Sequence, residues 1–359
     1  MSETGTAAGI MNLDDFSAAL DWQATHAFEN GAPCTSRILR ALEAVAQGET
    51  EVAKRMTNWP GLTLKDAMPL RIAGGLHHLL LSGADDRLAP VYAGEISDQS
   101  EVDALVCAVI EAHDAALVPW FDGPPQTNEA GRSASIMAGL LWLEQRVPAR
   151  FDMFELGASA GVNTMMHRYF YRLGQTEVGP ANSPMRIVPE WRGVGSPPAG
   201  DIEIIAIRGC DVGPIDLTDA DSALRLKSYV WPDATERMER IDAAIQLAAQ
   251  RAPNLVQMDA GDFVREQLAR EQEPCTTRVM FHSIMWQYMP TETQAGITDA
   301  MEQAGAQTTV EKPLAWVALE TDPATFRHEL RVRYWPGGEG EVCLAHAHPH
   351  GAWVEWTGG

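Results

Sequence analysis

The sequence predicts an α/β protein in which an all-helical N-terminal domain precedes a mostly parallel β-sheet domain that ends in an antiparallel hairpin. From Asn12 to about Arg146, apolar residues recur at helical spacing without strand-like alternation. From Phe151 onward, short apolar runs bounded by turn residues alternate with helical stretches, a pattern typical of parallel strands joined by crossover helices. We therefore expect a helical domain over residues 1–125 and a sheet domain over residues 126–359.

Capping residues and helix breakers bound the expected helices of the first part. Thr35 and Ser36 are good N-terminal caps, Gly48 ends the helix that follows them, and Pro148 ends the last one. The expected helices run over residues 13–26, 35–47, 64–81, 100–117 and 129–146.

The second part is expected to alternate strands and helices. Expected strands cover residues 151–156, 202–207, 255–258, 279–284 and 314–319, then a hairpin of 326–334 and 341–346, and a last strand of 352–356. Expected helices cover residues 223–251, 263–270 and 291–304. Residues 174–200, rich in Pro and Gly, are expected to form an insertion after the first strand unit.

Charge restricts the partners. The chain has 359 residues, with 49 Asp plus Glu against 27 Lys plus Arg and a net charge of −22. Such a surface repels phosphate groups, so we expect neither nucleic-acid nor anionic-membrane binding. The expected partner is a small-molecule substrate.

Cysteine usage and the N-terminus predict a cytoplasmic protein. The five cysteines are scattered and contain no C-x-x-C pair, which argues against a disulfide framework or a structural zinc site. The N-terminal residues have no basic region followed by an apolar one, and we expect no membrane span of the ~20 apolar residues required.

The segment Phe154–Asn163 is expected to be a strand, a turn of small residues and a helix. Such a turn can let the backbone approach a nucleotide-like ligand at the carboxyl end of a first strand. The same letters match G-x-S-x-G, the elbow of a serine hydrolase, with Ser159 as nucleophile and Asp322 and His348 or His350 completing a triad. A third interpretation is close packing alone. Context favours the ligand turn, because no strand precedes Phe151.

Glu155-x-Gly157-x-Ser159-x-Gly161 resembles the first motif of class I S-adenosylmethionine-dependent methyltransferases, whose sheet is Rossmann-like. The resemblance implies S-adenosylmethionine as cofactor, bound by Glu155 and by the turn residues Gly157, Ala158, Ser159 and Gly161. It further implies that Asp211 meets the ribose and Asp262 the adenine. His282, near the carboxyl end of the fourth strand, where open α/β sheets bind ligands, is expected to act as a catalytic base, with a buried structural histidine as the alternative. Ser159 replaces the usual middle glycine.

A second resemblance covers nearly the whole chain and is to a bacterial domain-of-unknown-function family, DUF2332. Its hallmarks here are Gln126-Thr127-Asn128-Glu129-x-x-Arg132, Glu155-Leu156-Gly157-Ala158-Ser159-Ala160-Gly161, Arg208-Gly209-Cys210-Asp211-x-x-Pro214, Trp231-Pro232-Asp233 and His348-Pro349-His350-Gly351-x-Trp353-x-Glu355-Trp356. This resemblance implies no established reaction.

Asn128, Glu129 and Arg132 lie about one helical turn apart and can face one site. We expect them, with Tyr169, either to cover the cofactor turn or to latch the helical domain to the sheet, and both alternatives stay open. His348 and His350 are grouped with these substrate-contacting residues. No metal site is expected from His346, His348 and His350, because Pro349 breaks the strand and no fourth ligand is identifiable.

The expected function is methyl transfer from S-adenosylmethionine to a small molecule, with the helical domain as a lid. A serine hydrolase and a non-catalytic binding module are the alternatives.

Overall fold

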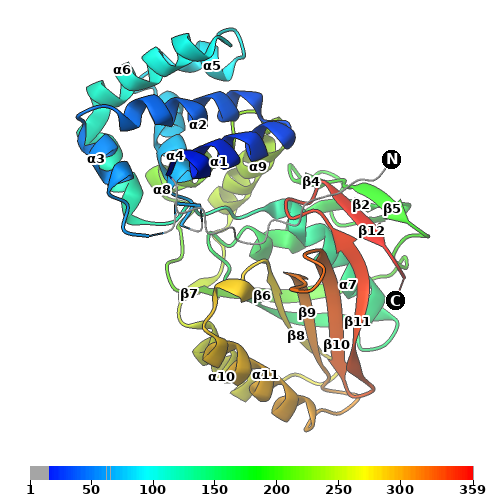
Figure 1. Ribbon diagram of the computed structural model, residues 1–359. Coiled ribbons are helices and arrows are strands. Elements are labelled where there is room, and N and C mark those ends of the chain that lie inside the picture. The colour runs from blue at the N-terminus through cyan, green and yellow to red at the C-terminus, as the bar shows by residue number, and fades with distance from the viewer. Residues whose placement is uncertain (1–15, 62, 65, 359) are drawn as a thin grey trace. The chain divides into compact units, whose positions relative to one another are not determined.

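The computed structural model describes residues 16–61, 63–64 and 66–358 (Figure 1). These residues form two compact units, one containing the chain up to Thr127 together with Asp219–Glu239, the other containing Asn128–Thr218 and the chain from Arg240 onward. The sequence assigns 219–239 to the sheet domain, but the buried Tyr229 in this segment packs into the core of the first unit.

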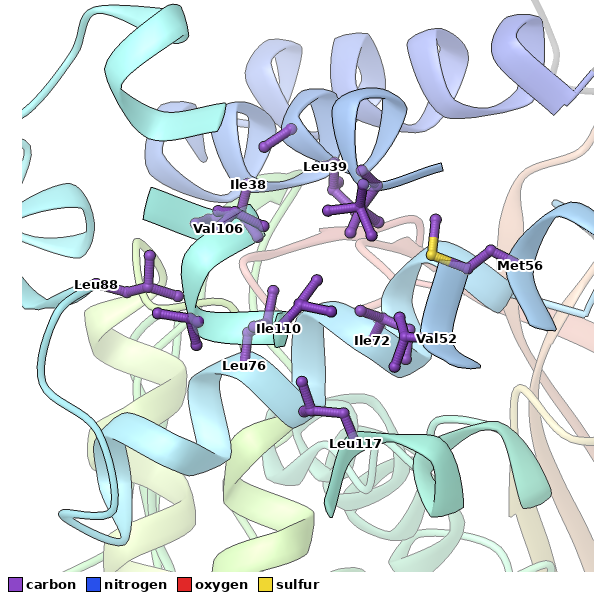
Figure 2. Packing of buried hydrophobic residues seen from close by; sticks show 14 of the residues in the cluster. Ile38, Leu39, Val52, Met56, Ile72, Leu76, Leu88, Val106, Ile110 and Leu117 are labelled. Carbon is purple, nitrogen blue, oxygen red and sulfur yellow. The ribbon is translucent and has the colours of Figure 1, made fainter. Parts of the chain in front are cut away.

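The first unit is helical. Its helices are α1 (Phe16–Glu29), α2 (Pro33–Ala46), α3 (Glu51–Thr57), α4 (Met68–Leu81), α5 (Ala89–Tyr92), α6 (Gln99–Leu117), the 3-10 helix η1 (Val118–Asp122), α8 (Ala220–Ser228) and the start of α9 (Thr235–Gln250). Figure 2 shows apolar side chains of α2, α3, α4 and α6 pointing toward one another, and these residues are fully buried. The core of this unit therefore depends on helix-to-helix packing.

One helix of this unit passes a simple test for a membrane span. By length and composition alone, Gln99–Asp122 could cross a bilayer, and 33% of its most apolar window is buried. The expectation that no segment is long and apolar enough therefore fails for this stretch. Core helices pass the same test, and Val102, Val106 and Ile110 pack into the core of the unit.

The second unit contains a nine-stranded sheet. Its strands are β1 (Arg150–Leu156), β5 (Glu190–Gly193), β6 (Glu203–Asp211), β7 (Leu255–Gln257), β8 (Thr277–Ser283), β9 (Leu314–Thr321), β10 (His328–Trp335), β11 (Gly338–Ala347) and β12 (Trp353–Trp356). The spatial order is β5-β12-β11-β10-β9-β8-β1-β6-β7. Strands β7, β6, β1, β8 and β9 are parallel, whereas β9 to β12 form antiparallel pairs, so the sheet is mostly parallel with an antiparallel extension, as expected.

Helices cover the two faces of this sheet. α10 (Ala260–Ala269) and α11 (Thr291–Gly305) pack against each other and cover the face that carries Phe154 and Leu156 of β1. α7 (Ser133–Glu144) lies on the opposite face, where Gly139 allows close contact with Val317 and Val332 (Figure 1). Because successive strand residues point to opposite faces, Glu155 lies on the α7 side.

The chain after the β1 turn, residues 157–162, differs from the prediction. Instead of an α-helix, the short 3-10 helix η3 (Asn163–Arg168) follows and leads directly into β2 (Phe170–Leu173). The turn here is held by i to i+3 bonds, from Thr164 N–H to Gly161 O and from Met165 N–H to Val162 O. This 3-10 helix is too short to direct a macrodipole of useful size at the turn.

The predicted insertion has structure of its own. β3 (Thr176–Val178) and β4 (Arg186–Ile187) form a small three-stranded sheet with β2, and β5 joins the edge of the large sheet. Because β4 pairs with β2, the direct parallel neighbours of β1 are β6 and β8. Asp211 thus lies at the carboxyl end of the strand beside β1.

Candidate functional site

The carboxyl ends of β1 and β8 finish in unusual backbone conformations. Ser159 has φ +52° and Ile284 has φ +50°, in the left-handed region that non-glycine residues rarely adopt, least of all β-branched ones. These strands are neighbours, and the chain order reverses between them, since β6 and β7 lie on one side of β1 while β8 and β9 lie on the other. Open parallel sheets bind ligands at such a switch point, where backbone strain is also commonly stored.

The backbone N–H groups of the turn mostly bond to the protein. Ala158 N–H donates to Cys210 O at 2.9 Å, Ser159 N–H to Asp211 Oδ2 at 2.8 Å and Gly161 N–H to Ala158 O at 2.7 Å. Val162 N–H donates to Asn128 Oδ1 at 2.7 Å. A phosphate cradle or an oxyanion hole needs several free N–H donors, so this turn is suited to neither.

In contrast to these backbone groups, several side-chain polar atoms beside the turn have no hydrogen-bond partner among the described residues. Glu155 is 2% exposed, and its Oε1 accepts one bond, from Asn163 Nδ2 at 3.3 Å. Glu155 Oε2, Asn163 Oδ1 and Ser159 Oγ are buried without a hydrogen-bond partner among the described residues. Buried polar atoms are normally paired, and unpaired ones cost free energy. Three such atoms in one motif indicate a place where a donor group from a ligand or water belongs.

The buried position also changes the acidity of Glu155. Removal from water raises its pKa from 4.5 to about 8, and the charge of Asp211 adds to this effect. The bond from Asn163 and the charge of Arg132 oppose it. Near neutral pH, a cation brought to Oε2 would stabilise the carboxylate and lower its pKa again. Near neutral pH the acid is mostly protonated, so a positively charged donor that binds at Oε2 would displace this proton.

The segment before α7 holds the turn from one side. Asn128 accepts the bond from Val162, while the buried Glu129 carboxylate accepts bonds from Gly131 N–H at 3.1 Å and Arg240 Nε at 2.9 Å. Tyr169, fully buried, donates its hydroxyl hydrogen to Val162 O. The structure thus brings Asn128 and Tyr169 to the same turn residue.

The same segment holds the C-terminal loop. Arg132 donates to Pro349 O at 2.8 Å and to Ser283 O, at the end of β8, at 3.3 Å. A Cβ on Gly351, whose φ is +73°, would lie 2.3 Å from the backbone of Gly131, so the two glycines allow these segments to touch. His348 is part of this tight turn, where its Nδ1 accepts the N–H of His350 at 3.1 Å.

The two acids assigned to the adenosyl group are in different environments. Asp211 accepts N–H bonds from Ser159 and from Gly213, at 2.8 and 2.9 Å, and so anchors the turn. A carboxylate has about four acceptor sites, which leaves Asp211 some capacity for a ligand hydroxyl. Asp262 lies in the first turn of α10 with its side chain 66% exposed and paired with Arg265 at 2.6 Å. Among the described residues, no hydrogen bond connects Asp262 to the unpaired atoms of the turn.

His282 is buried and both of its ring nitrogens are engaged. Nδ1 lies 2.7 Å from Glu320 Oε1, and Trp316 Nε1–H donates to Nε2 at 2.9 Å. This pattern assigns the hydrogen to Nδ1 and leaves a neutral ring. To act as a base, His282 would have to release Trp316, so the geometry favours a bracing role over the predicted catalytic one.

A cavity of about 510 Å³ lies next to His282, Trp316 and Glu320, on the α11 side of the carboxyl ends of β8 and β9. Trp286 and Trp316 line it, with ring centroids 5.5 Å apart, and Glu320, Asp322 and Gln294 supply polar atoms. This volume is typical of small-molecule sites. Met285 connects the two regions, because its N–H donates to Glu320 and its side chain packs over Gly157.

Sequence reasoning missed several of these residues. Asn163 ends the segment Phe154–Asn163, and Glu320 directly follows the predicted fifth strand, so the position of each residue in the sequence indicated that it could lie at the site. Arg240 and Met285 carried none, because only the folded chain brings them to Glu129 and Gly157.

Neither the curated proteins nor the solved structures compared with the chain gave a match. One family model matches residues 17–356, and it is described as "Uncharacterized protein conserved in bacteria (DUF2332)". Since the match spans nearly the whole chain, the protein belongs to this bacterial family.

Proposed function

We propose that the protein transfers a methyl group from S-adenosylmethionine to a small molecule in the cytoplasm. The observation that carries the proposal is the buried Glu155 carboxylate, whose Oε2 has no partner among the described residues, at the end of the first strand of the parallel sheet. The parallel strands follow the order 3-2-1-4-5, which is that of Rossmann-like sheets. The α-amino group of a methionine tail is the kind of cationic donor that Glu155 needs.

The residues at the turn are compatible with the methionine end of this cofactor. Glu155 would take the ammonium group, Asn163 Oδ1 can accept a further hydrogen bond there, and Ser159 Oγ can accept or donate one. Asp211 would take a ribose hydroxyl with its remaining acceptor capacity. Asp262 would contribute less to cofactor binding, because its side chain is exposed and paired with Arg265.

When bound, S-adenosylmethionine supplies an electrophilic methyl group for an in-line displacement, for which the protein chiefly provides orientation. The cavity lined by Trp286 and Trp316, on the α11 side of the sheet, is the proposed acceptor site, where a flat substrate can stack. Because Glu155 lies on the α7 side, the cofactor would have to extend past Gly157 and Met285 to reach this cavity. His282 fixes Trp316 and Glu320 at its floor. In this proposal the acceptor atom does not depend on His282 as a base.

Calorimetric titration with S-adenosylmethionine and with S-adenosylhomocysteine tests the proposal. The wild type should bind both, and Glu155→Gln should weaken binding by at least about ten-fold, the cost of one charge-assisted bond. Asp152→Asn is the matched control, because Asp152 is a half-buried acid at the opposite end of the same strand, with the charges of Arg270 and Arg278 near it. Absence of binding, or equal loss in both variants, contradicts the proposal.

One observation favours the hydrolase alternative. The left-handed Ser159 resembles the strained serine of a nucleophile elbow. However, its Oγ has no hydrogen-bond partner among the described residues, so no base activates it. We expect a fluorophosphonate probe to leave Ser159 unlabelled. Labelling that Ser159→Ala abolishes would replace the methyl-transfer proposal with a hydrolase.

A further inference from the structure

A cluster of three side chains with metal-ligating atoms lies on the antiparallel part of the sheet, away from the β1 turn. Glu329 of β10 and Cys343 and His346 of β11 each direct one such atom to a common point, with all three atoms within 4.8 Å of one another. β10 and β11 lie side by side in the sheet (Figure 1). The cluster is therefore held by a rigid ladder rather than by a loop.

A β-bulge makes this cluster possible. Cys343 and His346 are three residues apart, and in a regular strand they would point to opposite faces. The register pairs Leu330 with Ala345 and Arg331 with Cys343, which leaves Leu344 as an extra residue in β11. This extra residue turns Cys343 and His346 to the same side, and bulges often redirect side chains next to functional sites.

The distances leave room for an ion. Glu329 Oε1 lies 3.8 Å from His346 Nδ1, which is too long for a hydrogen bond. Tetrahedral zinc places a nitrogen and an oxygen ligand roughly 3.3 Å apart, so a small adjustment closes the site. His346 Nδ1 is buried and has no hydrogen-bond partner among the described residues. An imidazole nitrogen that has no hydrogen bond and faces a carboxylate oxygen 3.8 Å away is an arrangement that a metal ion can complete.

A second layer of contacts orients the carboxylate. Glu329 Oε2 accepts bonds from Arg331 Nε and Nη2, at 2.8 and 2.7 Å, which leaves Oε1 directed at the cluster. Arg331 is itself fixed by Asp322 and Glu341. Partners of this kind commonly hold metal ligands in place.

We propose that Glu329, Cys343 and His346 form a three-ligand site for a divalent transition metal of the zinc class, with a fourth position open to water or an external ligand. One thiolate and one carboxylate balance the charge of such an ion, and imidazole with thiolate selects zinc-class metals over magnesium or calcium. Arg331 and Glu341 also line the cavity described above, so the site lies beside it. The site is independent of S-adenosylmethionine binding.

Titration of the chelator-treated protein with CoCl₂ tests the site directly. A thiolate-to-cobalt charge-transfer band should grow, saturate at one ion per chain and disappear when ZnCl₂ is added. Cys343→Ser should remove the band, and His346→Gln should weaken zinc binding by at least about ten-fold. Cys275→Ser, at an exposed cysteine of the same unit, should change neither result. Absence of the band in the wild type, or its persistence in Cys343→Ser, overturns the proposal.

A measurement on the wild type keeps the test valid if a variant does not fold. ZnCl₂ should slow alkylation of Cys343 by iodoacetamide, followed by mass spectrometry, while Cys275 reacts at an unchanged rate. Equal protection of both cysteines, or of neither, contradicts the proposed site.

Discussion

Two acids, one in each unit, illustrate how differently the two halves of the chain use a carboxylate. Asp233, in the helical unit, accepts bonds from Cys34 N–H and Thr35 N–H, both at 2.9 Å, and from the Thr35 hydroxyl at 2.7 Å. Glu155, in the sheet unit, is more deeply buried, yet one of its oxygens has no partner among the described residues.

The difference separates a structural acid from a binding one. Asp233 satisfies the first N–H groups of α2, which gives this acid a structural role without any ligand. Glu155 is desolvated and only partly compensated, by the bond from Asn163 and the charge of Arg132, and such an uncompensated cost is typical of a site that binds a ligand. A carboxylate oxygen that lacks hydrogen-bond partners among the described residues, more than burial of the acid, therefore identifies the candidate site.

The largest expected effect is that of Glu155→Gln on the pH dependence of stability. The pKa of Glu155 rises from 4.5 in an exposed chain to about 8 in the fold, so folding favours the protonated acid. The contribution of Glu155 to wild-type stability is fully present below about pH 4.5 and is lost as the pH rises, by roughly 4 kcal/mol at pH 8. Glu155→Gln should remove this fall.

Urea unfolding at several pH values, in the absence of ligand, measures the effect. Wild type and variant should be similar near pH 5 and should diverge steadily up to pH 9, with Glu155→Gln the more stable protein. Parallel curves for the two proteins would show that Glu155 is compensated after all.

A smaller effect of opposite sign is expected at the structural acid. Asp233→Asn places an amide against the N–H donors of α2 and should destabilise the protein by about 2 kcal/mol. Asp221→Asn, at an exposed acid of α8 in the same unit, should cost less than about 0.5 kcal/mol. Thermal unfolding checks this pair, and equal effects of the two substitutions would remove the structural role of Asp233.

The smallest effect concerns the strained serine of the turn. Ser159→Gly should stabilise the protein by about 1 kcal/mol, because glycine adopts a φ of +52° without a Cβ clash. Ser159→Ala removes the unpaired hydroxyl but keeps the strain, so it should gain less than Ser159→Gly in chemical denaturation. A loss of stability in Ser159→Gly would indicate that the hydroxyl has a partner in solution.

Much of the fold could be predicted because it depends on local pattern. The apolar run from Phe151 became β1, and Pro336-Gly337-Gly338 separates β10 from β11 as a hairpin signal should. The membership of residues 219–239 in the helical unit could not be predicted, because Tyr229 in this segment is buried by residues distant in the sequence. The same holds for η3, because the bond from Val162 N–H to Asn128 Oδ1 joins residues 34 positions apart in the sequence.

The candidate site was predictable in position but not in detail. A turn of small residues after a first strand predicts where a ligand binds, and Glu155 was identified in this way. Whether an acid is saturated depends on the rest of the fold, as with His282, which Trp316 and Glu320 engage on both nitrogens. The Glu329, Cys343 and His346 cluster depends on a bulge that no spacing rule predicts.

The central claim is that Glu155 receives a cationic group from S-adenosylmethionine. Titration of the wild type at pH 7, in buffers of different ionisation enthalpy, tests this claim most directly. Because an ammonium group would lower a pKa of about 8 well below neutrality, binding should release about one proton, and Glu155→Gln should release none. Binding with the same enthalpy in every buffer would contradict the account.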